Sequence, residues 1–351
     1  MSRAQLTSTV EQSSGGVVAP FLAGKNKIIN GDFAISQRGQ SFSNPSFAAY
    51  TLDRWRNNNY DVAPTTYSIT QVAFDYSSSP ASDKLPISGY SGTYFFRSTI
   101  TTVGSNTVYD TCTQRIEGIP FSNQTVTVSF WAKSDSTRTQ KVTLAQNFGS
   151  GGSGDAAIFS LSSFTTTSSW QRFTFTGTVA NVAGNTIGSN PFLYFSIRQA
   201  SASGSVLDVW GVQVEAGSVA TPFTTASNTL QGELALAQRY YFRQSFVAAS
   251  QHFGLGQCFS STQAYAVIPF PVTMRTAPTS VETTGSAGDY ILLNSAASGV
   301  TCTAVPTFSA GWNNAGQVVA TVGSGLTAGN ATKLGGLNAT SAAYLGWSAE
   351  L

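Results

Sequence analysis

Charge is scarce in this chain. Asp, Glu, Lys and Arg together make up 10% of its 351 residues, against about 25% in ordinary soluble domains. The formal net charge is only +2, and the basic residues are scattered, so neither duplex nucleic acid nor an anionic membrane surface is an expected partner. No apolar run approaches the ~18 residues that a membrane-spanning helix needs. We therefore expect no membrane insertion.

Histidine and cysteine are almost absent as well. His252 is the only histidine, and no Gly-x-Ser-x-Gly motif offers a nucleophile for a Ser-His-Asp triad. Cys112, Cys258 and Cys302 are too widely spaced for a zinc site or a disulfide framework, so we expect buried free thiols. The sequence pairs no two of its 16 acidic residues, although glycoside hydrolysis needs two carboxyl groups at a fixed separation. We expect no enzyme activity and no cofactor.

Alternating apolar and polar residues dominate the first two thirds of the chain. Residues 126–131, 172–179, 192–198 and 206–214 each alternate with a period of two, which is typical of strands with one face on a core and one in solvent. Clusters of Gly, Ser and Asn separate them. With 12% aromatic residues the chain has enough apolar surface to fold. The pattern predicts a mostly β protein whose residues 25–225 form a jelly-roll β-sandwich.

One segment has the composition of a helix. Residues 231–244, within a connecting segment at 226–245, are rich in helix formers, and Asn228-Thr229 supplies an N-cap. Apolar residues lie on two helical faces, which suits a helix packed between two domains or two subunits. The predicted oligomer-interface residues are Leu236, Tyr240 and Tyr241.

The last third, residues 246–351, is predicted to form a smaller C-terminal β-domain. Residues 244–274 and 290–332 contain no charged residue, although both stretches keep the alternation of strands. Uncharged β surface is the kind that subunits pack against one another. We therefore expect this domain to make most of its contacts with copies of itself.

Several short motifs resemble one family in their order along the chain. They are NKIINGDF (26–33), QRG (37–39), LDRW (52–55), VWGVQVEAGS (209–218) with ATPF (220–223), ELALAQRYY (233–241), PVTMRTAPT (271–279) and the closing SAEL (348–351). Together they resemble bacteriophage tail-fibre and head-fibre proteins built on a jelly roll similar to carbohydrate-binding modules.

The resemblance implies a fibre or appendage subunit on the tail or capsid surface of a virion. Residues 1–24, which lack the apolar centre of a secretory signal, would then dock the subunit on other virion proteins. It also implies a homotrimer and a host surface polysaccharide as ligand. A purely structural capsid or tail decoration protein is the first alternative, and a glycan-degrading enzyme is the second.

The resemblance also implies a structural calcium site near the first and last strands of the jelly roll. The matching positions are Asp32 and Asp208. Calcium takes six to eight oxygen ligands, with several carboxylates among them, and Ala34 stands where a second acidic ligand is usual. We therefore expect no metal.

Loops that combine aromatic rings with amides or hydroxyls are candidates for sugar binding, because sugars stack on rings and exchange hydrogen bonds at their rims. Each loop could equally pack its ring on a neighbouring strand. Trp55 in particular could be a core residue, with Asp53 holding a backbone amide or Arg38. The candidate glycan-binding residues are Trp55, Asn57, Tyr60, Tyr90, Tyr94 and Trp312.

Two glycines carry structural predictions. Asn30-Gly31 is a tight-turn pair before the first strand. Gly211 follows Trp210 in a predicted central strand, where the missing side chain would let an aromatic ring from another strand lie close.

Overall fold

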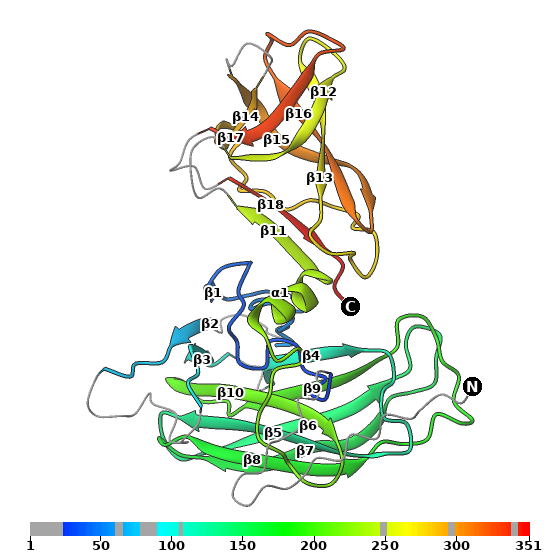
Figure 1. Cartoon of the computed structure of the whole chain (residues 1–351). Helices are drawn as coiled ribbons and strands as arrows, with labels where there is room; N and C mark the ends of the chain where they lie inside the picture. Colours follow the sequence, from blue (N-terminus) through cyan, green and yellow to red (C-terminus); the bar gives the residue numbers. More distant parts are fainter. Residues whose placement is uncertain are drawn as a thin grey trace, which may run out of the picture.

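A computed structural model describes residues 24–59, 66–77, 90–104, 108–245, 251–293, 299–337 and 343–351. The proposed docking arm at residues 1–24 and the candidate residue Tyr60 lie outside this part of the chain, apart from Gly24. Within it the protein is mostly β, as predicted, with a jelly roll, one α-helix and a second β unit (Figure 1). No helix of the described residues is long and apolar enough to cross a membrane.

The jelly roll consists of two antiparallel sheets packed face to face (Figure 1). The six-stranded sheet has the order β1-β2-β3-β10-β5-β8 and the four-stranded sheet the order β4-β9-β6-β7. The bounds are Ser41–Ser43 (β1), Thr66–Ala73 (β2), Tyr94–Thr102 (β3), Tyr109–Glu117 (β4), Thr125–Ser134 (β5), Arg138–Asn147 (β6), Ala156–Thr166 (β7), Gln171–Thr178 (β8), Phe192–Gln199 (β9) and Ser205–Ala216 (β10).

Apolar side chains from both sheets meet between them. On β5, Val126, Val128 and Phe130 point into this core, and Phe195 reaches it from β9. Burying each such side chain contributes about 1.5–3 kcal/mol to stability. Trp131 points to the opposite face of the six-stranded sheet and joins a second aromatic cluster. That cluster explains why β5 is buried on both faces. Its members are Phe74, Phe95, Trp131, Trp170, Trp210 and Phe223.

The predicted roles of the two glycines are confirmed. Asn30 has φ 59 at the turn, and a Cβ on Gly31 would lie 2.2 Å from the carbonyl oxygen of Val212. Gly211 has φ +66 at a register shift of β10, and a Cβ there would lie 2.7 Å from the Trp131 ring. The bulge thus brings Trp131 directly over the β10 backbone.

The predicted helix is present but shorter than expected. Helix α1 spans Leu230–Gln238, and Thr229 caps it by accepting a hydrogen bond from the Gly232 amide. The prediction of helix up to residue 244 is wrong, because strand β11 occupies Tyr241–Ser245. Consecutive aromatic residues favour strands, and pairing with β18 overrides the helical pattern here.

The C-terminal part is a closed six-stranded barrel on a two-stranded ribbon. The ribbon pairs β11 with β18 (Tyr344–Ser348), and a 3₁₀ turn, η1 (Ala287–Asp289), precedes β14. The barrel runs β12-β13-β16-β15-β14-β17. Its bounds are His252–Cys258 (β12), Gln263–Pro269 (β13), Tyr290–Leu293 (β14), Gly299–Trp312 (β15), Ala315–Val322 (β16) and Ala331–Gly336 (β17).

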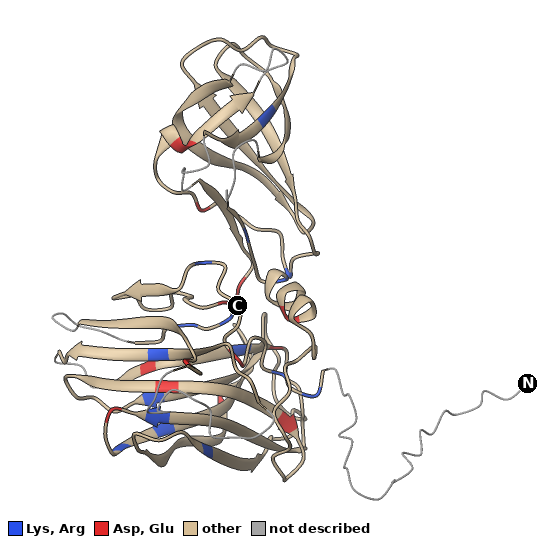
Figure 2. Cartoon of the chain, turned by 60° about the vertical axis from the view of Figure 1, so that its left-hand side comes forward, with Lys and Arg blue, Asp and Glu red and all other residues tan. Residues whose placement is uncertain are grey.

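The barrel has an apolar core of its own, which includes Cys258, Cys302 and Trp347. All three cysteines of the chain are buried and free, as predicted. Charged side chains are concentrated in the jelly roll and at the junction of the two parts, and the barrel carries few (Figure 2).

Residues 349–351 return from the ribbon to the jelly roll and hold the two parts together. Arg275 donates to the carbonyl oxygens of Ala349 (2.8 Å) and Glu350 (2.9 Å). Arg115 (2.9 Å) and the Tyr50 hydroxyl (2.8 Å) both donate to a main-chain oxygen of Leu351. We call residues 349–351 the C-terminal strap.

Candidate functional site

The outer face of the four-stranded sheet carries a long groove. Strand β9 turns Leu193, Phe195 and Ile197 into the core, so Phe192 and Tyr194 face outward. Three adjoining hollows of ≈ 300, 370 and 150 Å³ run along this face. The first two share Arg115, Asn147 and Phe192, and the last two share Asn58, Asp110 and Tyr194. We call this continuous depression the β9 groove.

Aromatic rings form part of the groove wall. Tyr194 is half-buried and lies 6.2 Å from Phe192 between ring centroids. Burial raises the pKa of the Tyr194 hydroxyl, as do the carboxylates of Asp155 and Asp110. Tyr194 therefore stays protonated around neutral pH and can both donate and accept hydrogen bonds.

Polar side chains surround the rings in fixed geometry. Arg198 clamps Asp110 with two hydrogen bonds of 2.8 and 3.0 Å, and its partly exposed side chain limits what this pair adds to stability. Asn147 donates to Asp155 at 2.7 Å. Strand pairing sets Arg198 opposite Asp110 on β4, so the sheet register itself aligns this pair.

A second cavity of ≈ 360 Å³ lies at the junction of the two parts. Its tyrosine rings are already covered by cations: the Arg38 guanidinium lies 3.4 Å from the Tyr241 ring centroid, and that of Arg243 lies 3.4 Å from Tyr344. A sugar ring would find these aromatic faces occupied. The junction cavity is therefore the weaker candidate for a ligand.

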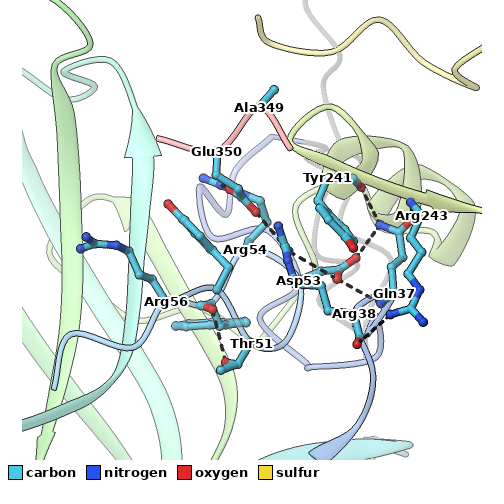
Figure 3. Close-up of polar contacts among 12 residues, drawn as sticks. Gln37, Arg38, Thr51, Asp53, Arg54, Arg56, Tyr241, Arg243, Ala349 and Glu350 are labelled. Carbon is cyan, nitrogen blue, oxygen red and sulfur yellow. Dashed lines mark hydrogen bonds and ion pairs between the residues drawn. The ribbon is translucent and has the colours of Figure 1, made fainter. Parts of the chain in front are cut away.

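Buried ion pairs next to that cavity join the parts (Figure 3). Arg54 is 1% exposed and pairs with Glu350 of the C-terminal strap. Arg38 lies 3.4 Å from the other oxygen of Glu350 and 4.0 Å from Asp53. Asp53 also accepts hydrogen bonds from the Gln37 amide (3.0 Å) and side chain (2.6 Å). The predicted role of Asp53, holding a backbone amide and Arg38, is confirmed.

The prediction that Trp55 and Asn57 contact glycan is wrong. Both are 0% exposed: Trp55 donates to the Asn30 carbonyl (2.9 Å) inside the core, and the Asn57 amide donates to Tyr67 (2.7 Å). The segment bridges β4 at Arg56–Thr113 in extended form. Alternate residues therefore face opposite sides, and their neighbours Arg56 and Asn58 line the groove instead.

The other predicted glycan contacts among the described residues lie away from the groove. Tyr90 packs against Trp131 and Trp210, and its hydroxyl accepts a hydrogen bond from the Phe223 amide (2.7 Å), which is a structural role. Tyr94 begins β3 in the other sheet. Trp312 is 48% exposed on the barrel and stays a candidate for a separate contact.

The predicted interface residues need correction too. Tyr240 and Tyr241 are 4% and 1% exposed, because their rings stack under Arg54 (3.5 Å) and Arg38 within the same chain. They leave little surface for another copy. Leu236 is only partly buried, and its place in an oligomer interface remains a prediction.

Asp208, one of the two positions implied for calcium, does not suit the ion. Arg97 holds both oxygens of Asp208 at 2.7 and 2.8 Å, and Lys133 lies 3.6 Å from it. No group of three or more His, Cys, Asp or Glu side chains gathers among the described residues. A carboxylate already neutralised by two cations is a poor calcium ligand.

Sequence reasoning missed the groove residues themselves, although residues 192–198 were predicted to be a strand. Its outward positions hold Phe192 and Tyr194, two large rings on a face turned away from the core. Two large rings at outward positions of one strand, where polar residues are expected, are unusual. That pattern could have singled out the site before the structure was known.

Comparisons with known proteins show similarity of fold only. No family model matches the chain, and no curated protein matches it. Similar solved structures include the CBM22-1 xylan-binding domain from Paenibacillus barcinonensis (13% identity, 51% of this chain and 95% of that one, TM-score 0.31). They also include a family 11 carbohydrate-binding module from Clostridium thermocellum (13% identity, 52% of this chain and 98% of that one, TM-score 0.29). A third is a Stig cyclase from Fischerella sp. (10% identity, 55% of this chain and 97% of that one, TM-score 0.33). At such low identities and TM-scores, nothing about ligand or activity passes to this chain.

Proposed function

We propose that this protein binds glycan chains in the β9 groove. The observation that carries the proposal is the outward ring of Tyr194 in a continuous hollow that is also lined by amides and charged side chains. The neighbouring Phe192 ring is covered by Arg115, whose guanidinium lies 4.3 Å from the ring centroid. Sugar rings bind through their C–H faces to aromatic rings, and their hydroxyls exchange hydrogen bonds with amides and carboxylates. The groove offers both on a rigid sheet, which keeps the ordering cost of binding low.

The finer proposal is a bacteriophage fibre or appendage subunit that binds host surface polysaccharide. It rests on the sequence motifs, with residues 1–24 as the docking arm. The barrel supplies the surface for the predicted homotrimer, since its outer face exposes Leu255 (69%), Val267 (43%) and Tyr265 (38%). Leu255 and Val267 are cross-strand partners on β12 and β13, so they form one apolar patch. A purely structural decoration protein would share these features but would not need the groove.

The proposed role is binding without catalysis. Asp110 and Asp155 line the same hollow, which is the one feature that favours a glycan-cleaving enzyme as second candidate. Both oxygens of Asp110 are held by Arg198, so this carboxylate is not placed to give up or take a proton. Incubation with a bound polysaccharide should release no reducing sugar, and release that stops in Asp110→Asn would favour the enzyme.

A glycan array probed with the full chain tests the binding proposal. We expect retention of a subset of surface polysaccharides or their oligosaccharides. An array on which no glycan is retained above background, at micromolar protein, would contradict it. Such a result would leave the structural decoration role as the better account.

A further inference from the structure

The groove is unusually rich in charge for this chain, and its carboxylates are already engaged. Asp110 is clamped by Arg198. Glu350 turns its side chain away from the groove to Arg54 and Arg38 at the junction. Asp155, at the exposed rim, accepts a hydrogen bond from Asn147. Asp155 keeps its charge, because its partner Asn147 is neutral. A ligand therefore meets one open carboxylate at the rim and the guanidinium groups of Arg115 and Arg275 at the strap end of the groove.

Arg115 is the cation at the centre of this arrangement. It lines both of the larger hollows. Its guanidinium lies 4.3 Å from the Phe192 ring centroid, and one nitrogen donates at 2.9 Å to a main-chain oxygen of Leu351, the last residue of the sequence. It forms no ion pair with a carboxylate side chain of the described residues. A guanidinium fixed on an aromatic face with further donors available is a preorganised anion receptor.

A second guanidinium stands at the same end of the groove. Arg275 donates to two carbonyls of the C-terminal strap and to the Asn190 side-chain oxygen at 2.9 Å. All three contacts are to neutral oxygens. Glu117, whose pKa Arg275 helps to lower, is paired with Arg239 at 3.0 Å. Arg115 and Arg275 thus place two positive charges on the hollow that the strap closes.

The sheet register connects these charges to the aromatic surface. Arg115 on β4 and Tyr194 on β9 are direct cross-strand partners. Directly opposite residues have Cβ atoms about 4.5–5.5 Å apart, which is the width of one sugar ring. A sugar stacked on Tyr194 would hold its ring substituents within reach of the Arg115 guanidinium.

We propose that the β9 groove selects acidic glycans, and that Arg115, with Arg275 beside it, binds the carboxylate of an acidic sugar residue. This inference rests on the proposed glycan binding in the same groove. The carboxylate takes the planar donors of the guanidinium, while Tyr194 receives the face of the sugar. Because the strap reaches this hollow, the barrel unit shapes the end of the binding site.

An array of acidic glycans, each printed beside its carboxyl-reduced neutral counterpart, tests the selection. We expect the bound members to be acidic and binding to fall about tenfold or more on carboxyl reduction, because hydrogen bonds to charged groups are the strong ones. Equal binding of both forms, or binding confined to neutral glycans, would overturn the inference while glycan binding itself stands. No binding to any member would overturn both.

Substitutions in the full chain test whether Arg115 binds the carboxylate of the glycan. Arg115→Gln should weaken binding of an acidic array hit by about tenfold to a hundredfold and leave binding of its carboxyl-reduced form unchanged. Tyr50→Phe is the matched control, since it loses another hydrogen bond to the same main-chain oxygen of Leu351 but no charge. Arg138→Gln removes one positive charge from an ion pair with Asp135, outside the groove. Unchanged affinity in Arg115→Gln, or an equal loss in all three variants, would overturn the assignment.

Discussion

Asp53 shows how one buried residue ties stability to pH. Desolvation raises its pKa to about 6, although Arg38 and the two hydrogen bonds from Gln37 act in the opposite direction. The folded protein thus holds this proton more tightly than the unfolded chain, in which the pKa stays near 3.8. Between those two values the native state binds more protons, so its stability falls as the pH rises from about 4 to about 6.

Replacing Asp53 with Asn should remove this part of the pH dependence. From pH 4 to pH 6 the unfolding free energy of the wild type should fall by roughly 1–3 kcal/mol more than that of Asp53→Asn, since one pKa unit corresponds to about 1.4 kcal/mol. Denaturant unfolding of both proteins across this range measures the difference. Asp32, whose burial also raises its pKa to about 6, is present in both proteins and cancels. Parallel profiles would show that Asp53 is ionised throughout.

The same residues show what sequence can predict at this scale. Asp53 next to Arg54 and Trp55 indicates a packed, ion-paired turn, and the structure confirms it. Which of two neighbouring side chains faces the groove depends on the register against β4, and that register is set by a strand more than fifty residues away. A shift of one residue exchanges the two faces. The local sequence therefore indicates Trp55 and Asn57, whereas the structure places Arg56 and Asn58 at the groove.

At the scale of elements, the course of β10 depends on Gly211. Gly211 combines a positive φ with the Trp131 ring stacked over its backbone. An Ala here would be strained in the left-handed backbone conformation, and its Cβ would push Trp131 out of the aromatic cluster.

We expect Gly211→Ala to lower the unfolding free energy by roughly 2–4 kcal/mol. The control is Gly204→Ala, at φ +76 with no atom within 4 Å of the added Cβ, which should cost only about 1 kcal/mol. Thermal or denaturant unfolding of the two variants compares them. Equal losses would mean that the ring contact contributes nothing beyond the backbone conformation.

The end of α1 shows why an element boundary escaped prediction. Residues 239–244 continue the helical pattern of apolar positions, and local propensity alone extends the helix through them. Tyr241 instead opens the ribbon by pairing with Ser348, more than a hundred residues away. A partner at that separation leaves no mark in the local sequence.

For the whole molecule, the sequence predicted the class of each part but not how the parts are joined. Period-two alternation indicates strands, and the uncharged C-terminal stretches indicate a separate β unit. Neither pattern shows that the barrel closes, or that the strap brings Glu350 to Arg54 across 296 positions of the chain. The charged residues gathered at this junction (Figure 2) mark it only once the fold has brought them together.

The barrel is also where self-association should be tested. We expect the wild type to scatter light as a homotrimer, at three times 36.8 kDa. Leu255→Asp should dissociate it, because a charge would enter the apolar patch of β12 and β13. Ile187→Asp, at a 52% exposed position of the jelly roll, is the control and should leave the trimer intact. A wild-type monomer at micromolar concentration would contradict the prediction.

The central claim is that glycans bind on the outer face of the four-stranded sheet, and Tyr194→Ala tests it most directly. Isothermal titration with an array-selected glycan should show about a tenfold loss of affinity, since an aromatic contact contributes about 0.5–1.5 kcal/mol beyond the area that it buries. Tyr265→Ala, which removes an exposed tyrosine from the barrel, should bind like the wild type. Wild-type affinity in Tyr194→Ala, with the loss appearing in Tyr265→Ala instead, would place the site on the barrel and contradict the account.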